Sequence, residues 1–162
     1  TTCTGYYMRK LFDENLPKNG IRATDLTYYY MRYAEVLLIY AEAMAEQGDI
    51  PAALEALNEV RARVDLPAKS AKNKTEFMKL LRHERMIELA FEGHRFWDIR
   101  RWKIGEQTQK IYRTKITKQS DGSFRYEKVL LEERNWEDKM YLYPIPLSEQ
   151  ILNNNLGQNP GW

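Results

Sequence analysis

The stretch from Arg82 to Trp102, RHERMIELAFEGHRFWDIRRW, holds the densest group of side chains that could take part in chemistry. Three carboxylates, Glu84, Glu88 and Glu92, follow one another at four-residue spacing, which places them along one side of a helix. Like charges at this spacing repel by roughly 0.2–0.5 kcal/mol per pair, so cations are expected to lie close to them. A catalytic carboxylate pair, a metal site and an ion-pair network would all use such a group.

Metal chemistry lacks ligands in this stretch. His83 and Glu84 begin like the zinc motif HExxH, but Ile87 stands where the second histidine would be needed. The Glu-x-x-His motif of di-iron helical bundles does not occur in the sequence, and two histidines cannot by themselves build a closed metal site. We therefore expect no metal and no other cofactor.

An ion-pair network is the favoured interpretation, because buried carboxylates need paired cations more often than they carry out chemistry. Arg61 and Arg63, at the end of a preceding predicted helix, are candidate cations from outside the stretch. We expect the network to hold helices together and to contain no catalytic residue. Its expected members are Glu84, Arg85, Glu88, Glu92, Arg95, Asp98 and Arg101.

The elements around this stretch are predicted to be mainly helices. Apolar residues at helical spacing predict helices over 29–47 and 49–64, with Gly48 ending the first and Asp49 capping the second. The apolar positions of these two helices are Ala34, Leu37, Leu38, Ala41, Ala45, Leu54, Leu57 and Val60. Their small residues and the Gly-Asp turn are typical of a tetratricopeptide unit. A second helical pair is expected over 75–92 and 94–103. The apolar face expected on its first helix comprises Phe77, Leu80, Leu81, Ile87 and Phe91.

After residue 105 the pattern changes. Partly alternating segments over 111–117 and 124–131 flank Gln119-Ser120-Asp121-Gly122, which predicts a β-hairpin with an Asp-Gly turn. The prolines at 144 and 146 favour an extended path, Ser148 and Glu149 a short helical turn, and the end an irregular tail. The expected fold class is therefore mainly α, with tetratricopeptide-like helical pairs, a β-hairpin and an irregular tail.

Composition indicates one domain. The chain has 162 residues and a formal charge of only +2, with both signs interspersed, which argues against a nucleic-acid partner. Its single cysteine, Cys3, cannot form an internal disulfide. Within the expected domain, 1–162, we distinguish a lead-in over 1–27, helical pairs over 28–104, a hairpin insert over 105–136 and a Pro-Ile-Pro-containing tail over 137–162.

Four segments occur in an order that resembles one known family: MRYAEVLLIYAEAMAEQG at 31–48, NEVRARVDL at 58–66, the stretch over 82–102, and YLYPIPLSEQILNNNLGQNPGW at 141–162. They are similar to the C-terminal part of the SusD/RagB family of outer-membrane nutrient-binding lipoproteins of Bacteroidetes. Thr4-Gly5-Tyr6-Tyr7 with Arg9-Lys10 resembles a segment that precedes this region. The resemblance is weakest over 106–136.

The resemblance implies a lipid-anchored, surface-exposed outer-membrane protein that serves polysaccharide utilization. Such a protein binds glycans or other nutrients without hydrolysing them and delivers them to a SusC-like TonB-dependent transporter. It also implies that this chain is the final portion of a longer protein, with the missing N-terminal half as a partner and the lipid anchor upstream. Cys3 matches a late segment of the family and is expected to be an ordinary, semi-buried thiol.

Sugar binding uses exposed aromatic faces together with amides, carboxylates or guanidinium groups for the hydroxyls. Trp136 beside Asn135, and Tyr126 beside Arg125 in the hairpin, are the candidate ligand-binding residues. Trp97 and Trp102, at apolar helical spacing, are expected in the core instead. Two other functions stay open. One is a helical protein–protein scaffold without a sugar site. The other is a glycan-active enzyme, because the distance between two catalytic carboxylates is set by the fold and cannot be read from their spacing in the sequence.

Overall fold

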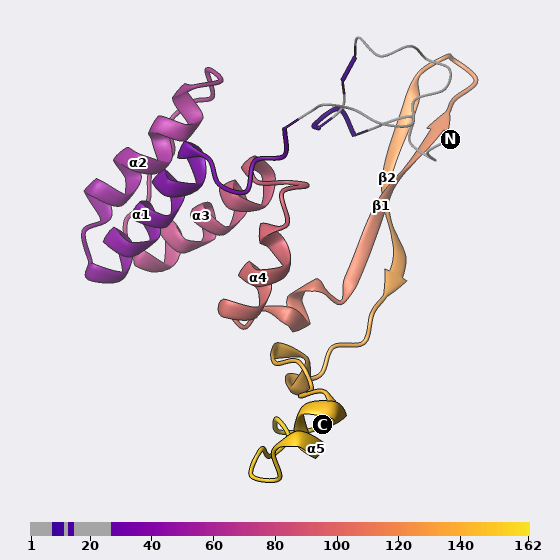
Figure 1. Cartoon of the computed structure of the whole chain (residues 1–162). Helices are drawn as coiled ribbons and strands as arrows, with labels where there is room; N and C mark the ends of the chain where they lie inside the picture. Colours follow the sequence, from indigo (N-terminus) through magenta and orange to yellow (C-terminus); the bar gives the residue numbers. More distant parts are fainter. Residues whose placement is uncertain (1–7, 12, 15–26) are drawn as a thin grey trace. The chain divides into compact units, whose positions relative to one another are not determined.

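The computed structural model describes residues 8–11, 13, 14 and 27–162 (Figure 1). The chain divides into two compact units. We call the described residues up to Arg95 the helical unit and Phe96–Trp162 the hairpin unit, and describe each by itself. The expectations for Cys3 and for Thr4 to Tyr7 fall outside the described residues.

The helical unit contains α1 (Tyr33–Gln47), α2 (Ile50–Ala62) and α3 (Lys74–Glu88). Gly48 takes a left-handed φ of 91° and ends α1, and the Asp49 side chain accepts a hydrogen bond of 3.0 Å from Ala52 N at the start of α2. The predicted helical hairpin with its Gly-Asp turn is therefore confirmed, although α1 begins at Tyr33 and not near Tyr29.

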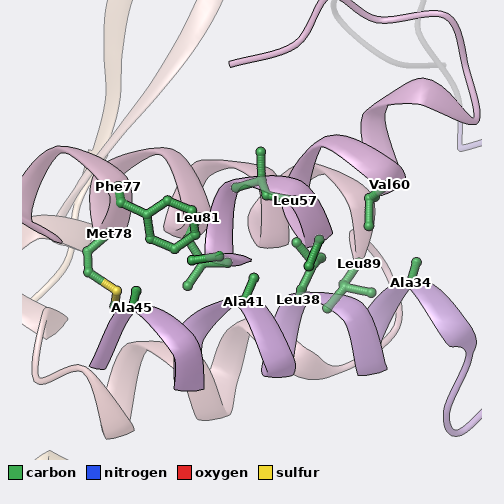
Figure 2. Close-up of a cluster of buried hydrophobic side chains, with 12 residues drawn as sticks. Ala34, Leu38, Ala41, Ala45, Leu57, Val60, Phe77, Met78, Leu81 and Leu89 are labelled. Atoms are coloured by element: carbon green, nitrogen blue, oxygen red, sulfur yellow. The ribbon is translucent and has the colours of Figure 1, made fainter. Parts of the chain in front are cut away.

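A single apolar cluster joins the three helices (Figure 2). Small residues on α1 let the other two helices approach closely, while Phe77 and Leu81 of α3 and Leu57 of α2 fill the centre. The buried cluster comprises Ala34, Leu38, Ala41, Ala45, Ala53, Ala56, Leu57, Val60, Phe77, Met78, Leu81 and Leu89. Helical spacing predicted most of these positions.

The predicted apolar face of α3 is wrong in its second half, because Ile87 and Phe91 are both exposed. The buried stripe of α3 continues instead through Glu84 and Arg85, which lie about two helical turns beyond Phe77 and one turn beyond Leu81. The helix also ends at Glu88, and Phe91 has a φ of 66°, so it cannot extend a helical face. Ion pairs replace apolar packing at this end of α3.

The helix α4 (His94–Arg101) crosses the boundary between the units, and its residues from Phe96 onward belong to the hairpin unit. A 3-10 helix η1 (Gly105–Thr108) leads into β1 (Lys110–Lys118), which pairs antiparallel with β2 (Phe124–Glu133). The register places Ile116 opposite Tyr126, with an irregularity between Ile111 and Tyr112. The predicted hairpin is confirmed.

Short elements follow β2 in the hairpin unit: a 3-10 helix η2 (Asp138–Tyr141) and α5 (Leu147–Leu152). Hydrogen bonds between side chains and the backbone fix the conformation of the tail. Gln158 bridges to the backbone N–H and carbonyl of Ile145, and the Trp162 indole N–H donates to the carbonyl of Lys139 at 3.0 Å. Among the described residues, no helix has the length and apolar character needed to cross a membrane.

Candidate functional site

The carboxylate of Glu84 is held by a cation from the preceding helix. Arg61 of α2 donates to Glu84 Oε2 at 2.6 Å, and each residue is only 8% exposed. The Arg61 Nε also donates to the carbonyl of Pro67 at 3.0 Å, which fixes the segment between α2 and α3. A buried pair with this second hydrogen bond ties two helices and their connection together.

Glu88 and Glu92 share one guanidinium. Arg32, the residue before α1, donates from Nη1 to Glu88 at 2.5 Å and from Nε to Glu92 at 2.8 Å. Arg63 adds a contact to Glu88 at 2.9 Å, and Lys10 pairs with Glu92. The four-residue repeat of carboxylates is thus matched by cations from three other segments of the helical unit.

These ion pairs shift the ionisation of the groups that form them. Burial raises the pKa of Glu92, but hydrogen bonds from Arg32 and Lys10 outweigh it, so the pKa lies below its ordinary value. Burial likewise lowers the pKa of Arg32, and hydrogen bonds to Glu92 and Glu88 outweigh it, so its pKa is raised. Both groups therefore stay charged at neutral pH, as structural ion pairs require.

The other expected members of the network lie in both units. Arg85 is buried and Arg95 is half-buried in the helical unit. Asp98, only 3% exposed, pairs with Arg101 at 2.8 Å within the hairpin unit. The sequence had not indicated Arg32 or Lys10 as partners of the carboxylates, and their only signal was the need for cations beside Glu88 and Glu92.

Trp136, a candidate ligand-binding residue, lies half-buried in the hairpin unit. Its indole packs directly on the backbone at Gly105, where an added Cβ would lie 1.8 Å from the ring. Its ring meets that of Tyr141 at a centroid distance of 5.1 Å, and the Tyr141 hydroxyl accepts a hydrogen bond of 3.0 Å from Gly105 N. Trp136 is therefore part of a packed cluster, and its neighbour Asn135 donates to Glu137 at 2.9 Å.

Tyr126 and Arg125 form the more accessible candidate pair. Tyr126 is 63% exposed on β2, and Arg125 pairs with Glu127 at 2.9 Å across the strand surface. Seven residues of strand separate Tyr126 from the end of β2 at Glu133, which is roughly 23 Å. The two candidate pairs thus belong to opposite ends of the hairpin and do not form one site.

The expectation that Trp97 lies in the core is wrong, because this residue is 62% exposed, and Trp102 is half-buried. The stripe of α4 that is buried contains Asp98 and not the tryptophan. The Trp97 and Phe96 rings are packed edge to face, with their centroids 5.0 Å apart. Among the residues that the structure describes, no three histidine, cysteine, aspartate or glutamate side chains are grouped in a way that could hold a metal ion.

The helical hairpin with its tetratricopeptide-like turn, followed by a β-hairpin and an irregular tail, has counterparts among known proteins. The sequence matches the SusD family over residues 1–162. The chain therefore belongs to the SusD family, which confirms the resemblance drawn from its motifs.

Individual SusD-like proteins are also similar to this chain in sequence and structure. SusD-like protein P2 of Formosa agariphila is 33% identical over 158 residues, which cover 91% of this chain and 28% of that protein. The crystal structure of a SusD-like protein from Bacteroides fragilis is similar with a TM-score of 0.72 and 38% identity, over 83% of this chain and 26% of that one.

A crystal structure of a SusD superfamily protein from Parabacteroides distasonis has a TM-score of 0.54 and 26% identity, over 81% of this chain and 26% of that one. The chain thus spans little more than a quarter of the length of each of these relatives. These likenesses confirm the expected fold class, mainly α with a β-hairpin.

Proposed function

We propose that this chain is part of a non-catalytic, surface-exposed outer-membrane protein that binds glycan nutrients and delivers them to a SusC-like TonB-dependent transporter. The match to the SusD family over residues 1–162 is the observation that carries the proposal. Further support comes from the carboxylates of the Arg82–Trp102 stretch. Those of Glu84, Glu88 and Glu92 are engaged in ion pairs with arginines, which is unlike a pair of carboxylates held ready for acid–base chemistry.

The accessible candidate for sugar contact is Tyr126 with Arg125 on β2 of the hairpin. An exposed phenol ring offers a flat face for the C–H surface of a sugar, and the neighbouring guanidinium offers donors for its hydroxyls. Trp136 and Asn135 form a second candidate pair, with less ring surface open to a ligand because the indole is packed against Gly105. We propose Tyr126 as the first residue to test.

The helical unit offers a surface for the rest of the proposed longer protein. Tyr33, Val36, Ile39 and Tyr40 of α1 are exposed on the helix surface that does not contribute to the core. Since the relatives are more than three times as long as the matched region, we propose that the N-terminal part of the family protein covers these side chains. A helical scaffold without sugar affinity would use the same surface for another protein.

An array of plant and host glycans, probed with the fluorescently labelled chain, tests the proposed sugar binding. Binding to at least one glycan class, reduced by Tyr126→Ala, is the expected result. Purification of the tagged chain together with a SusC-like protein encoded in the same genome tests the proposed binding to a transporter. Transporter capture without any glycan binding would favour the scaffold, and release of shorter sugars from a bound glycan would favour an enzyme.

A further inference from the structure

The end of α4 and the segment after β2 together form a strongly basic pocket within the hairpin unit. Its volume of about 570 Å³ lies in the range of small-molecule sites. Four cationic side chains and only one carboxylate are among its lining residues, which are Arg100, Arg101, Lys103, Asp138, Lys139, Tyr141, Leu142 and Pro160.

Cations at the end of a helix can be explained by the helix dipole alone, because its carboxyl end attracts positive charge. That explanation covers Arg100, Arg101 and Lys103, which lie at or just after the end of α4. It does not cover Lys139, which comes from η2, 36 residues farther along the chain than Lys103. Positive groups from two separate segments therefore converge on this pocket.

Two of the four cationic side chains are not paired with a carboxylate among the described residues. Within the described residues, Arg101 pairs with Asp98 and Lys139 with Glu137, whereas neither Arg100 nor Lys103 is paired with a carboxylate. The one side-chain hydrogen bond of Arg100 found there goes to the carbonyl of Phe96 at 3.1 Å, and its buried Nε has no acceptor. A guanidinium has five N–H donors, so most of its capacity is unused.

Arg100 is also held in place. Its guanidinium carbon lies 3.5 Å from the centre of the Phe96 ring, and the Trp136 and Tyr143 rings lie 5.4 and 5.7 Å away. Such stacking restricts the side chain before any ligand arrives, which reduces the entropy lost on binding. A fixed guanidinium with free donors is suited to oxyanions, which it can bind with two parallel hydrogen bonds.

A comparison with the helical unit shows what distinguishes this pocket. A smaller pocket of about 420 Å³ there is also lined by two arginines, Arg32 and Arg63. Both of those guanidinium groups already contact Glu88, at 2.5 and 2.9 Å. Their charge is thus used within the protein, whereas Arg100 and Lys103 are left for an anion from outside.

The rest of the pocket wall fits a sugar ring better than a bare ion. Leu142 and Pro160 are apolar, and Tyr141 contributes an aromatic ring. The Tyr141 hydroxyl accepts from Gly105 N and therefore retains its own proton for donation. Apolar and aromatic surface beside hydrogen-bond donors matches the two-sided character of a saccharide.

We propose that this pocket binds an acidic sugar residue of a glycan through its carboxylate or sulfate ester, with Arg100 and Lys103 contacting the anionic oxygens. The proposal rests on the proposed function, which it narrows to glycans that carry negative charge. The end of α4 would then be a ligand-binding element in addition to the candidate residues of the hairpin.

Calorimetric titration of the chain with matched pairs of sugars tests the proposal. One pair is an oligogalacturonide and its fully methyl-esterified form, and the other is a sulfated galactan oligosaccharide and its desulfated form. Sodium sulfate serves as the free anion. We expect at least one acidic sugar to bind at least tenfold more tightly than its neutral counterpart, and more weakly at high ionic strength.

The variant Lys103→Gln removes one pocket charge at an exposed position and should weaken the acidic sugar by about tenfold. Lys103→Arg should restore binding, and Lys139→Gln should weaken it independently. The matched control is Lys118→Gln, which removes the same charge from the exposed end of β1 and should leave affinity unchanged. Circular dichroism of each variant checks that the fold is retained.

Several results would overturn the proposal. Equal affinity for acidic and neutral sugars would do so while leaving the proposed glycan binding intact. Equal losses in Lys103→Gln and Lys118→Gln would show that only overall charge matters. Sodium sulfate binding as tightly as the sulfated sugar would remove the role of the sugar ring. Absence of binding by either acidic sugar would exclude the pocket as an acidic-sugar site, whatever the glycan array shows.

Discussion

The indole of Trp136 lies directly on the backbone of Gly105, so closely that a Cβ at residue 105 would come within 1.8 Å of the ring. Gly105 follows the end of α4, and Trp136 follows β2, so this contact joins the two ends of the hairpin segment. The same glycine donates its N–H to the hydroxyl of Tyr141, which lines the basic pocket. Absence of a side chain at residue 105 is therefore a condition for the local structure.

Gly105→Ala is expected to destabilise the hairpin unit by about 2 kcal/mol, because the indole or the backbone must move to admit a methyl group. Near-ultraviolet circular dichroism should show an altered tryptophan signal, and urea unfolding a lower midpoint. Gly157→Ala is the matched control, since no atom lies within 4 Å of the added Cβ there. Equal behaviour of the two variants would contradict the packing described for Trp136.

Arg32→Met is expected to reduce the free energy of unfolding by about 2 kcal/mol, because Glu88 and Glu92 lose the cation that they share. The loss should stay below that of a fully isolated buried charge, since Arg63 and Lys10 still contact these carboxylates. Urea titration followed by far-ultraviolet circular dichroism gives the value.

Arg9→Met provides the comparison for Arg32→Met. Arg9 pairs with Glu14, but its side chain is 84% exposed, and exposed ion pairs contribute little. A much smaller change in stability than for Arg32→Met is expected. If Arg32→Met were as mild as Arg9→Met, the shared ion pair would not be a main link between α3 and the segment before α1.

Protonation of Glu92 should make the stability of the folded chain depend on pH. Its pKa in the folded chain lies below the ordinary value of 4.5, so its stabilising contribution is fully present above that pH. The contribution is lost as the pH falls through the lowered pKa, because protonation breaks the ion pairs. Glu92→Gln should therefore be less stable than the original chain at pH 7, with the difference shrinking below about pH 4.

Denaturant titrations over pH 3–7 measure this difference. Glu55→Gln, at an exposed carboxylate on α2, is the matched control and should change stability little. A Glu92→Gln effect that stayed constant down to pH 3 would show that lost packing, and not lost charge, explains it.

The apolar side chains on α1 should bind a hydrophobic dye. Tyr33, Val36, Ile39 and Tyr40 are exposed together, and we expect the chain either to dimerise or to enhance the fluorescence of such a dye. Replacing Val36 and Ile39 by glutamine should reduce the signal by about half or more, whereas Leu152→Gln on α5 should not. A monomer that gives no dye signal would contradict the proposal that another part of the protein covers this surface.

Local features were predictable from the sequence, because the residues that cause them are close together along the chain. Gly48 and Asp49 set the turn between α1 and α2 by their own backbone and side-chain chemistry, and helical spacing located Leu38, Leu57 and Phe77 in the core. Motifs spread over the chain also indicated the family.

Long-range pairing was predictable only in part. Arg61 and Arg63 were expected among the cations and do pair with Glu84 and Glu88, whereas Arg32 was not expected. Arg32 reaches Glu88 and Glu92 from 56 and 60 residues away, and one sequence holds no information on which distant arginine approaches a given carboxylate. The same reason explains the errors at Ile87 and Trp97. Periodicity favoured an apolar stripe at both places, whereas the buried positions on α3 and α4 include the charged residues Glu84 and Asp98. The basic pocket likewise depends on Lys139 meeting the end of α4.

Calorimetric titration of the chain with a panel of neutral and acidic oligosaccharides, followed by chain-length analysis of each sugar, tests whether the protein binds glycans without cleaving them. We expect saturable binding heat with at least one sugar, and we expect every sugar to keep its length. In Tyr126→Ala or Lys103→Gln, this binding should be lost or weakened about tenfold. Tyr112→Ala, which removes a phenol from the opposite strand, should bind normally. Absence of binding heat with every sugar, or the appearance of shorter products, would show that the proposed non-catalytic glycan binding is wrong.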